Sequence, residues 1–315
     1  MIQPTYLSFT GHGNSCGEPP GVFTGAVMHL FGIEVDRNAV QRRLVDTLLN
    51  AVPNSPVRYS CFLDMALVSF MHIDKCTTPT EVIGWVPGNE SAIWIPLLEK
   101  VHPDLLPTRI VLWAPYIFID YAIGMVTGRE VWGWSKAAAT IDMPATASTS
   151  PSFNLCTMVF DHFGIDTQGH ERLLLSVEGT APLGTHSTWS DARTAVREVV
   201  ARLSGVQAPK GPDPLGADLI IQTVALKQLR DSLTPKLACF QAIVNSPVEM
   251  TRFNGGGFHH GNFSLRVTTC DSHQIVADLT GVAPSRVTTT LPVRFAGWLA
   301  FDFRALPGAV VAQSI

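Results

Sequence analysis

Two segments of the chain repeat apolar residues with the period of an α-helix. In residues 36–52, Asp36 can cap the N-terminus, because aspartate is a favoured N-cap residue. In residues 187–205, Gly205 follows the last apolar position as a stop signal. The sequence therefore predicts two amphipathic helices packed on a larger structure. Their inward positions are Ala39, Val40, Leu44, Val45, Leu48, Leu49 and Val52, then Ala192, Ala195, Val196, Val199, Val200 and Leu203.

Most other segments are short β-branched or aromatic runs between Gly, Pro, Asn and Asp, a pattern typical of strands. Many strands and few helices predict a mainly β protein built on a curved antiparallel sheet or barrel. Residues 143–151 and 208–216 are expected loops, and neither separates regions of different composition, so we expect a single domain over residues 1–315. The expected strands are 65–72, 92–98, 109–119, 153–163, 171–178, 219–229, 237–248, 262–268 and 274–279.

Composition narrows the class of protein. The 315 residues are 46% hydrophobic and 15% charged, enough apolar material for a large core. The formal net charge of -4 and the scattered Lys and Arg argue against a nucleic-acid partner. No stretch approaches the roughly 18 apolar residues of a membrane span, and the N-terminus has no leader features. We therefore expect a soluble, cytoplasmic protein with no membrane partner and with reduced cysteines.

Several residues match fragments of motifs without the context that those motifs need. Residues 13–17 fit the GxSxG spacing of a nucleophile elbow, but residues 18–21 contain two prolines where a helix is required. The glycines of residues 255–261 form no phosphate cradle, and we expect His259 and His260 beside them to lie in an exposed turn. Histidines next to acidic residues lack a third metal ligand at a recognisable spacing. We expect no metal and no cofactor.

The most informative stretch is residues 114–141, APYIFIDYAIGMVTGREVWGWSKAAATI. It predicts a strand that ends at Asp120, a short turn or helix, and then a lone Lys136 in apolar surroundings that include Trp134 and three alanines. A lysine amine ordinarily has a pKa of about 10.4 and is charged at neutral pH. Desolvation lowers such a pKa and favours the neutral amine, which can attack a carbonyl. The stretch is therefore a candidate site for a nucleophilic lysine.

Three motifs resemble the acetoacetate decarboxylase superfamily: PYIFID, GREVWG, and Lys136 at the spacing of the family's first lysine. NSPVEMTRF and EPPGVFTGAVMHLFGIEVD are also similar, so the resemblance extends along most of the chain. It implies a curved, mostly antiparallel β fold around an apolar pocket, usually assembled as a homo-oligomer. It also implies that Lys136 forms an imine with a ketone, whose cationic nitrogen stabilises the carbanion left by carbon–carbon cleavage; acetoacetate decarboxylase is a known case of an activated lysine.

The sequence departs from the family at several catalytic positions. The family's second lysine is Ala137 here and its proline is Ser135. The first strand carries Gly25, Ala26 and Val27 where the decarboxylases place an arginine. The strand expected to hold a pocket glutamate reads AIWIP, with Glu90 just upstream as the nearest replacement. We therefore expect poor turnover of acetoacetate and a larger, more apolar substrate, bound mainly through buried area.

The candidate catalytic residues are Lys136, Arg129, Glu130 and Glu90. Arg129 and Glu130 either contact the substrate or brace the turn that presents Lys136. The apolar segments AIWIP, IVLWAPYIF and VWGW predict a substrate pocket around the lysine. Its expected lining residues are Tyr116, Phe118, Trp132, Trp134 and Trp94.

Three functions remain open at this point. The first is a lyase that acts on a β-keto acid or related carbonyl compound through a Schiff base on Lys136, by decarboxylation or by aldol or dehydration chemistry. The second is a cyclase or isomerase that templates an apolar substrate, with Lys136, Arg129 and Glu130 supplying hydrogen bonds. The third is a catalytically inactive protein that binds a small molecule in the same pocket.

Overall fold

The computed structural model describes residues 5–7, 16–81, 84–101, 106–144, 150–184, 186–205, 219–284 and 286–314. Its elements are β1 (Gly21–Glu34), α1 (Arg37–Val40), η1 (Gln41–Val45), β2 (Val57–Cys61), β3 (Met65–Thr77), β4 (Trp85–Val101), β5 (Leu106–Ile119), α2 (Ala122–Thr127), η2 (Gly128–Trp132), β6 (Lys136–Asp142), β7 (Ser152–Val159), β8 (His170–Gly179), α3 (Ala192–Ser204), β9 (Ile220–Arg230), β10 (Ala238–Phe258), β11 (Phe263–Thr268), α4 (Ile275–Thr280), β12 (Thr288–Ala305) and β13 (Ala309–Ser314).

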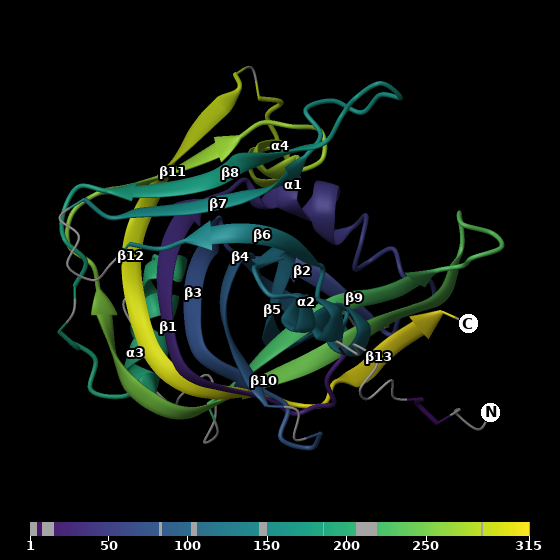
Figure 1. Cartoon of the computed structure of the whole chain (residues 1–315), viewed down its shortest axis with the longest axis horizontal. Helices are drawn as coiled ribbons and strands as arrows, with labels where there is room; N and C mark the ends of the chain where they lie inside the picture. Colours follow the sequence, from purple (N-terminus) through teal and green to yellow (C-terminus); the bar gives the residue numbers. More distant parts are fainter. Residues whose placement is uncertain are drawn as a thin grey trace.

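The strands form a 13-stranded sheet in the order β13-β10-β9-β5-β6-β7-β8-β11-β12-β1-β3-β4-β2. Additional pairings of β10 with β12 and of β4 with β5 close part of the sheet into a ring of β1, β3, β4, β5, β9, β10 and β12 (Figure 1). Strand β5 runs parallel to β6 and β9, and the other pairings are antiparallel. The prediction of a mainly β fold with a curved, largely antiparallel sheet or barrel is confirmed.

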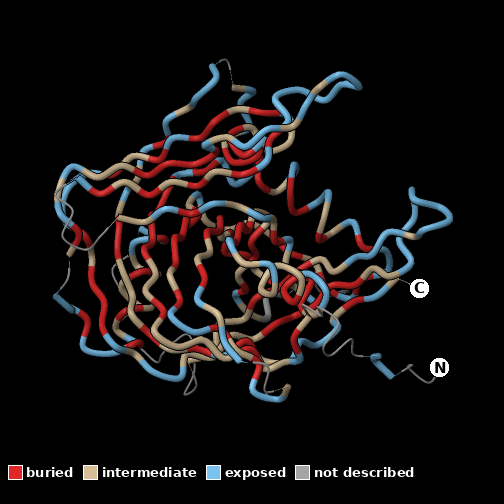
Figure 2. Tube along the Cα trace, viewed as in Figure 1, coloured by how far each residue is buried: buried red, intermediate tan, exposed pale blue. Residues whose placement is uncertain are grey.

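The strands β12, β1, β3 and β4 form a wall in which most residues are buried or half-buried (Figure 2). On one face, Phe31, Phe70 and Ile93 belong to the main core, which is shared with β7, β8, β11, α1 and α4. On the other face, smaller clusters hold Met71 and Phe301. Because successive side chains of a strand point to opposite faces, each strand of the wall contributes to both clusters.

The two predicted helical segments are present, but only the second is a regular α-helix throughout. Asp36 caps α1 by accepting hydrogen bonds from the backbone N–H groups of the two residues that follow Arg37. After α1 the backbone N–H of Asp46 donates to the carbonyl of Gln41 at 2.8 Å, a wider turn than that of an α-helix. Helix α3 ends at Gly205, whose φ of 68° gives the left-handed C-terminal conformation expected of glycine.

Some strand predictions are wrong in kind or extent. Residues 274–279 were expected to form a strand, but α4 occupies them and buries Ile275, Val276 and Leu279. These three residues share one face of the helix, but this helix is short and begins with two β-branched residues, which favoured the strand prediction. The predicted set also lacked five strands: β1, β2, β6, β12 and β13.

The expectation of an exposed turn is wrong for His259 and right for His260. His259 is buried, and its ring nitrogen lies 3.1 Å from that of His29 on β1. Its other ring nitrogen accepts the backbone N–H of Gly184 at 3.0 Å. His260 is exposed. The two histidines therefore differ completely in environment although they are adjacent in sequence.

The predicted loop 208–216 and residues 145–149 of the predicted loop 143–151 lie outside the described residues. Within the described ranges, no helix has the length and hydropathy needed to cross a membrane.

Candidate active site

Lys136 opens strand β6, and its side chain is buried, with 5% of the residue's surface exposed. Strand β6 runs beside β5, which sets Lys136 opposite Ile117. The turn before β6 leaves room for the lysine stem at Gly128, where an added Cβ would lie 2.6 Å from the Cδ of Lys136. The glycine of the GREVWG motif therefore allows the lysine to pack against η2.

The lysine amine forms an ion pair with Glu90 of β4. The distance from Lys136 Nζ to Glu90 Oε2 is 2.6 Å, and the two side chains are 6% and 14% exposed. The structure therefore brings two of the four candidate catalytic residues, Lys136 and Glu90, into direct contact.

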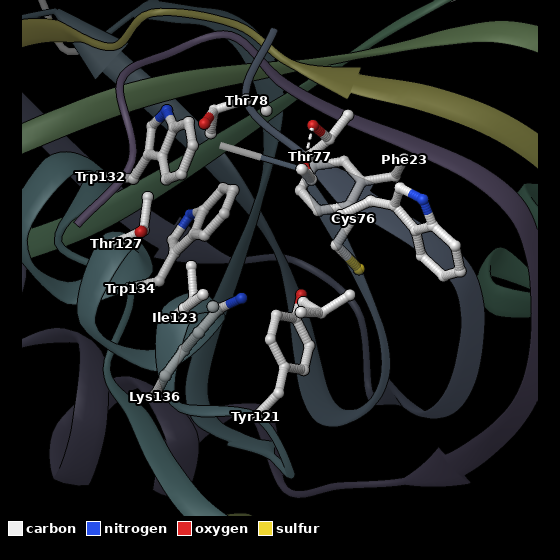
Figure 3. A pocket seen from close by; sticks show the side chains of 15 residues that line it. Phe23, Cys76, Thr77, Thr78, Tyr121, Ile123, Thr127, Trp132, Trp134 and Lys136 are labelled. Carbon is white, nitrogen blue, oxygen red and sulfur yellow. Dashed lines mark hydrogen bonds between the residues drawn. The ribbon is translucent and has the colours of Figure 1, made fainter. Parts of the chain in front are cut away.

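Lys136 lines a solvent-open cleft (Figure 3), whose empty space, including open solvent at its mouth, is about 620 Å³. The other lining residues come from the start of β1, the facing ends of β3 and β4, and the α2 to β6 segment. Small and aliphatic side chains form part of the wall, and threonine hydroxyls are its main additional polar groups. The aromatic side chains of the cleft are Phe23, Trp85, Tyr121, Trp132 and Trp134.

Two tryptophans build one side of the cleft. The rings of Trp132 and Trp134 stack, with centroids 4.9 Å apart and planes 20° apart. Trp132 is anchored by its indole N–H, which donates to the carbonyl of Leu306 at 2.8 Å. The amine of Lys136 lies 5.1 Å from the centroid of the Trp134 ring, within the range of a cation–π interaction. Trp134 therefore lies between Trp132 and the amine of Lys136.

Tyr121 forms another side of the cleft and was not among the predicted site residues. Its ring fits between two glycines: a Cβ added at Gly88 or Gly124 would lie 2.0 Å or 2.2 Å from it. Burial is the main cause that raises the pKa of Tyr121, with added contributions from nearby Cys76. Burial likewise raises the pKa of the Cys76 thiol to about 11. Both groups are therefore neutral near pH 7.

Arg129 and Glu130 do not line the cleft, and both are exposed. The guanidinium of Arg129 donates from Nη1 to the backbone carbonyl of Lys136 at 3.0 Å. The carboxylate of Glu130 interacts with the thiol of Cys16, whose pKa is raised by burial and then by this carboxylate. Of the two roles open to these residues, their contacts favour bracing of the turn.

Three of the five residues expected to line the pocket lie elsewhere. Tyr116 donates from its hydroxyl to Asp278 Oδ2 at 2.6 Å, and Phe118 is buried in the main core. Because Ile117 pairs with Lys136, its two neighbours along β5 must point to the opposite face. Trp94 packs beside Ile117 but does not reach the cleft. The expected lining by Tyr116, Phe118 and Trp94 is therefore wrong, whereas Trp132 and Trp134 line the cleft.

The comparisons with known proteins agree with this architecture. No protein-family model and no curated protein matches the chain. The structure resembles acetoacetate decarboxylase from Legionella pneumophila with a TM-score of 0.60 and 13% identity, over 99% of this chain and 93% of that one. A second acetoacetate decarboxylase structure gives a TM-score of 0.62 at 10% identity, with 98% and 96% of the chains covered.

A further similar structure is the enduracididine biosynthesis enzyme MppR in complex with pyruvate. It has a TM-score of 0.56 and 16% identity, over 97% of this chain and 95% of that one. These similarities extend over nearly the full length of each protein, although the sequences have diverged widely. The chain therefore has the fold of the acetoacetate decarboxylase-like enzymes, as its sequence motifs predicted.

Proposed function

We propose that this chain is a lyase that forms an imine between Lys136 and the carbonyl carbon of a small-molecule substrate. The observation that carries the proposal is the buried pair of Lys136 and Glu90, 2.6 Å apart, at an aromatic cleft. A nucleophilic lysine needs a group that removes its proton, and a carboxylate within hydrogen-bond distance meets this requirement. The acetoacetate decarboxylase-like fold supports the same chemistry.

The reaction starts when the ammonium of Lys136 passes a proton to Glu90. The neutral amine attacks the carbonyl carbon and gives a carbinolamine. Glu90 then returns the proton to the hydroxyl group of the carbinolamine. That group leaves as water, and a cationic iminium remains on Lys136. The iminium accepts the electron pair of the bond between its α-carbon and the next carbon, so that bond breaks, carbon dioxide or an aldehyde leaves, and an enamine forms. Protonation of the enamine and hydrolysis by water then release the product and restore Lys136.

Both decarboxylation of a β-keto acid and aldol-type cleavage or dehydration use this iminium. In either case, the cleft favours a substrate that is more apolar than acetoacetate. Each square ångström of apolar surface that leaves water contributes about 25 cal/mol to binding. The proposal therefore assigns most of the binding energy to the aromatic wall and the chemistry to Lys136 and Glu90.

The test is reductive trapping with cyanoborohydride in the presence of carbonyl compounds, followed by digestion and mass spectrometry. The expected result is an adduct on Lys136, with none in Lys136→Met, which keeps the length of the side chain without the amine. Lys75→Met removes an exposed lysine outside the cleft and serves as the matched control. Turnover of a substrate without a trapped mass, or full activity in Lys136→Met, would favour the template function instead.

A further inference from the structure

The cleft carries little charge apart from its lysine. Among the described residues that line it, Lys136 is the only charged one, and Glu90 already pairs with it. The ammonium of Lys75 lies over the outer Trp85 ring at 5.1 Å, and that of Lys227 lies over Phe240 at 5.4 Å. Neither of these lysines lines the cleft.

This distribution of charge decides which substrates the cleft can accept. When the carbinolamine loses water, Glu90 returns to its carboxylate form and neutralises the iminium on Lys136. A substrate carboxylate would be a second negative charge with no cation of its own in a partly dehydrated space. Burying an ion without a partner is costly, so the cleft discriminates against anionic substrates.

The aromatic wall selects for shape as well as for polarity. One face of the Trp134 ring stacks on Trp132, and the Lys136 amine lies 5.1 Å from the ring centroid. The amine extends toward the space between Trp134 and Tyr121 (Figure 3). An iminium carbon is one bond from this nitrogen, so a planar group attached to that carbon continues between the two rings. Offset stacking adds to the free energy of binding beyond the buried area.

We infer that the substrate presents a neutral aldehyde or ketone carbonyl conjugated to an aromatic ring. The inference rests on the proposed imine at Lys136 and narrows its substrate class: of the two reaction types that share the imine, it favours aldol-type cleavage or dehydration of a neutral carbonyl compound over decarboxylation of an anionic β-keto acid. An aryl iminium is planar and spreads its positive charge into the ring, which places a flat cation against the electron-rich face of Trp134. A saturated ring of similar size fills the same volume without a face that can stack.

The experiment compares three aldehydes in the cyanoborohydride trapping assay: benzaldehyde, cyclohexanecarbaldehyde and 4-formylbenzoate. Each rate is divided by the rate with Nα-acetyl-lysine, which corrects for the intrinsic reactivity of the carbonyl. The expected normalised rate for benzaldehyde exceeds that for cyclohexanecarbaldehyde by about 5-fold, because of stacking. It exceeds that for 4-formylbenzoate by about 30-fold, because of the unpaired carboxylate.

Two variants test the two sources of selectivity separately. Trp134→Leu keeps an apolar side chain but removes the ring, and it should reduce the preference for benzaldehyde over cyclohexanecarbaldehyde to about twofold or less. Thr77→Arg places a cation on the lining of the cleft and should raise the rate with 4-formylbenzoate about 10-fold, as an added charge-assisted partner would. Thr77→Gln, which is long but neutral, is the matched control and should leave that rate low.

The possible outcomes separate this inference from the proposed function. If no aldehyde gives an adduct on Lys136 of the folded protein, the imine itself is overturned, and the substrate class with it. If all three aldehydes give adducts at equal normalised rates, the imine stands and the inference is overturned. The wild-type comparison decides the matter even if a variant fails to fold.

Discussion

Glu90 and Lys136 face each other because both are paired with the same strand, β5. Glu90 lies opposite Ile119 in the antiparallel pairing of β4 and β5, and Lys136 lies opposite Ile117 in the parallel pairing of β5 and β6. Paired residues share a face of the sheet, as do residues two apart along one strand. The two charged side chains therefore project to the same side of the sheet. They are 46 residues apart in sequence, and the pairing of their strands with β5 brings them together.

This relationship predicts the effect of Glu90→Gln, which keeps the shape of the side chain but removes the carboxylate that we propose as the proton acceptor. We expect the rate of imine trapping at Lys136 to fall by a factor on the order of 10² to 10⁴, the usual contribution of general acid–base catalysis. The variant should also lose folding stability, because the buried ammonium loses its partner. Trapping rates measured from pH 6 to pH 10, beside urea unfolding, separate the two effects.

Glu34→Gln is the control for this measurement, since Glu34 is exposed and lies outside the cleft. Its trapping rate should stay within about twofold of the wild-type rate, as expected for a substitution away from the reacting groups. Faster trapping in Glu90→Gln at neutral pH would contradict the proposal. That result would mean that Glu90 only holds the amine in its charged form.

Local patterns were sufficient to predict parts of the fold and of the site. The apolar period and Gly205 predicted α3, and the strand that ends near Asp120 and the apolar surroundings of Lys136 were found from adjacent residues. The orientation of Tyr116 could not be predicted in this way, because the face to which it points depends on the pairing of β5 with β6. This pairing is parallel, and no motif in the sequence of either strand determines its register.

The far side of the cleft was missed for a related reason. Phe23 of β1 and Cys76 of β3 are opposite each other in the antiparallel pairing of these two strands. They approach Lys136 only when the strands curve into a ring, and this is a property of the whole sheet. Gly88 and Gly124 carried a usable signal, because glycines inside a strand or a helix often mark the close approach of another group. Here that group is Tyr121.

The position of Tyr121 between two glycines leads to a second prediction. In Gly88→Ala, the new Cβ would lie 2.0 Å from the tyrosine ring, so the ring must move or the strands must separate. We expect a loss of about 1 to 3 kcal/mol in the free energy of unfolding, as is usual for overpacking, and slower trapping at Lys136. Urea unfolding measures the loss. Adding Tyr121→Leu to Gly88→Ala should recover part of it, whereas strictly additive losses would argue against the clash.

Cys76 and Cys239 give a third prediction, which concerns thiol reactivity. Burial raises the pKa of Cys76 to about 11, so only about one thiol in 1,000 is ionised at pH 8. Cys239 is exposed. We expect iodoacetamide at pH 8 to alkylate Cys239 at least about 100-fold faster than Cys76, with both sites quantified by mass spectrometry after digestion. Equal rates would show that the cleft around Cys76 opens freely to solvent.

The fourth prediction concerns the buried pair of His29 and His259. The Nδ1 of His259 accepts the N–H of Gly184, so the proton of this neutral ring lies on Nε2 and is donated to Nδ1 of His29, 3.1 Å away. Burial, and secondarily the facing His259 ring, lowers the pKa of His29 to about 3. Burial, and secondarily His260, lowers the pKa of His259 to about 4. Both rings are therefore neutral in the folded protein down to acidic pH.

These depressed values fix the direction of the pH dependence. Below pH 6.5 the unfolded chain binds protons at both histidines, whereas the folded protein does not until the pH approaches 4 and 3. The stability that the neutral pair contributes is thus fully present above pH 6.5 and is lost as the pH falls. Between pH 7 and pH 5 we expect each ring to reduce the free energy of unfolding by about 2 kcal/mol. Urea unfolding at half-unit steps of pH gives this slope.

His29→Asn tests whether the histidine pair causes this pH dependence. The amide oxygen of the asparagine can accept the Nε2 proton of His259, but the amide does not titrate. The variant should be less stable than the wild type at pH 7.5, because the ring contact with Phe153 is lost. Its pH slope between pH 7 and pH 5, however, should be about half that of the wild type, since only His259 then resists protonation. His162→Asn, which removes an exposed histidine outside the pair, is the matched control and should keep the wild-type slope. An unchanged slope in His29→Asn would mean that other groups cause the acid sensitivity and that the buried pair does not.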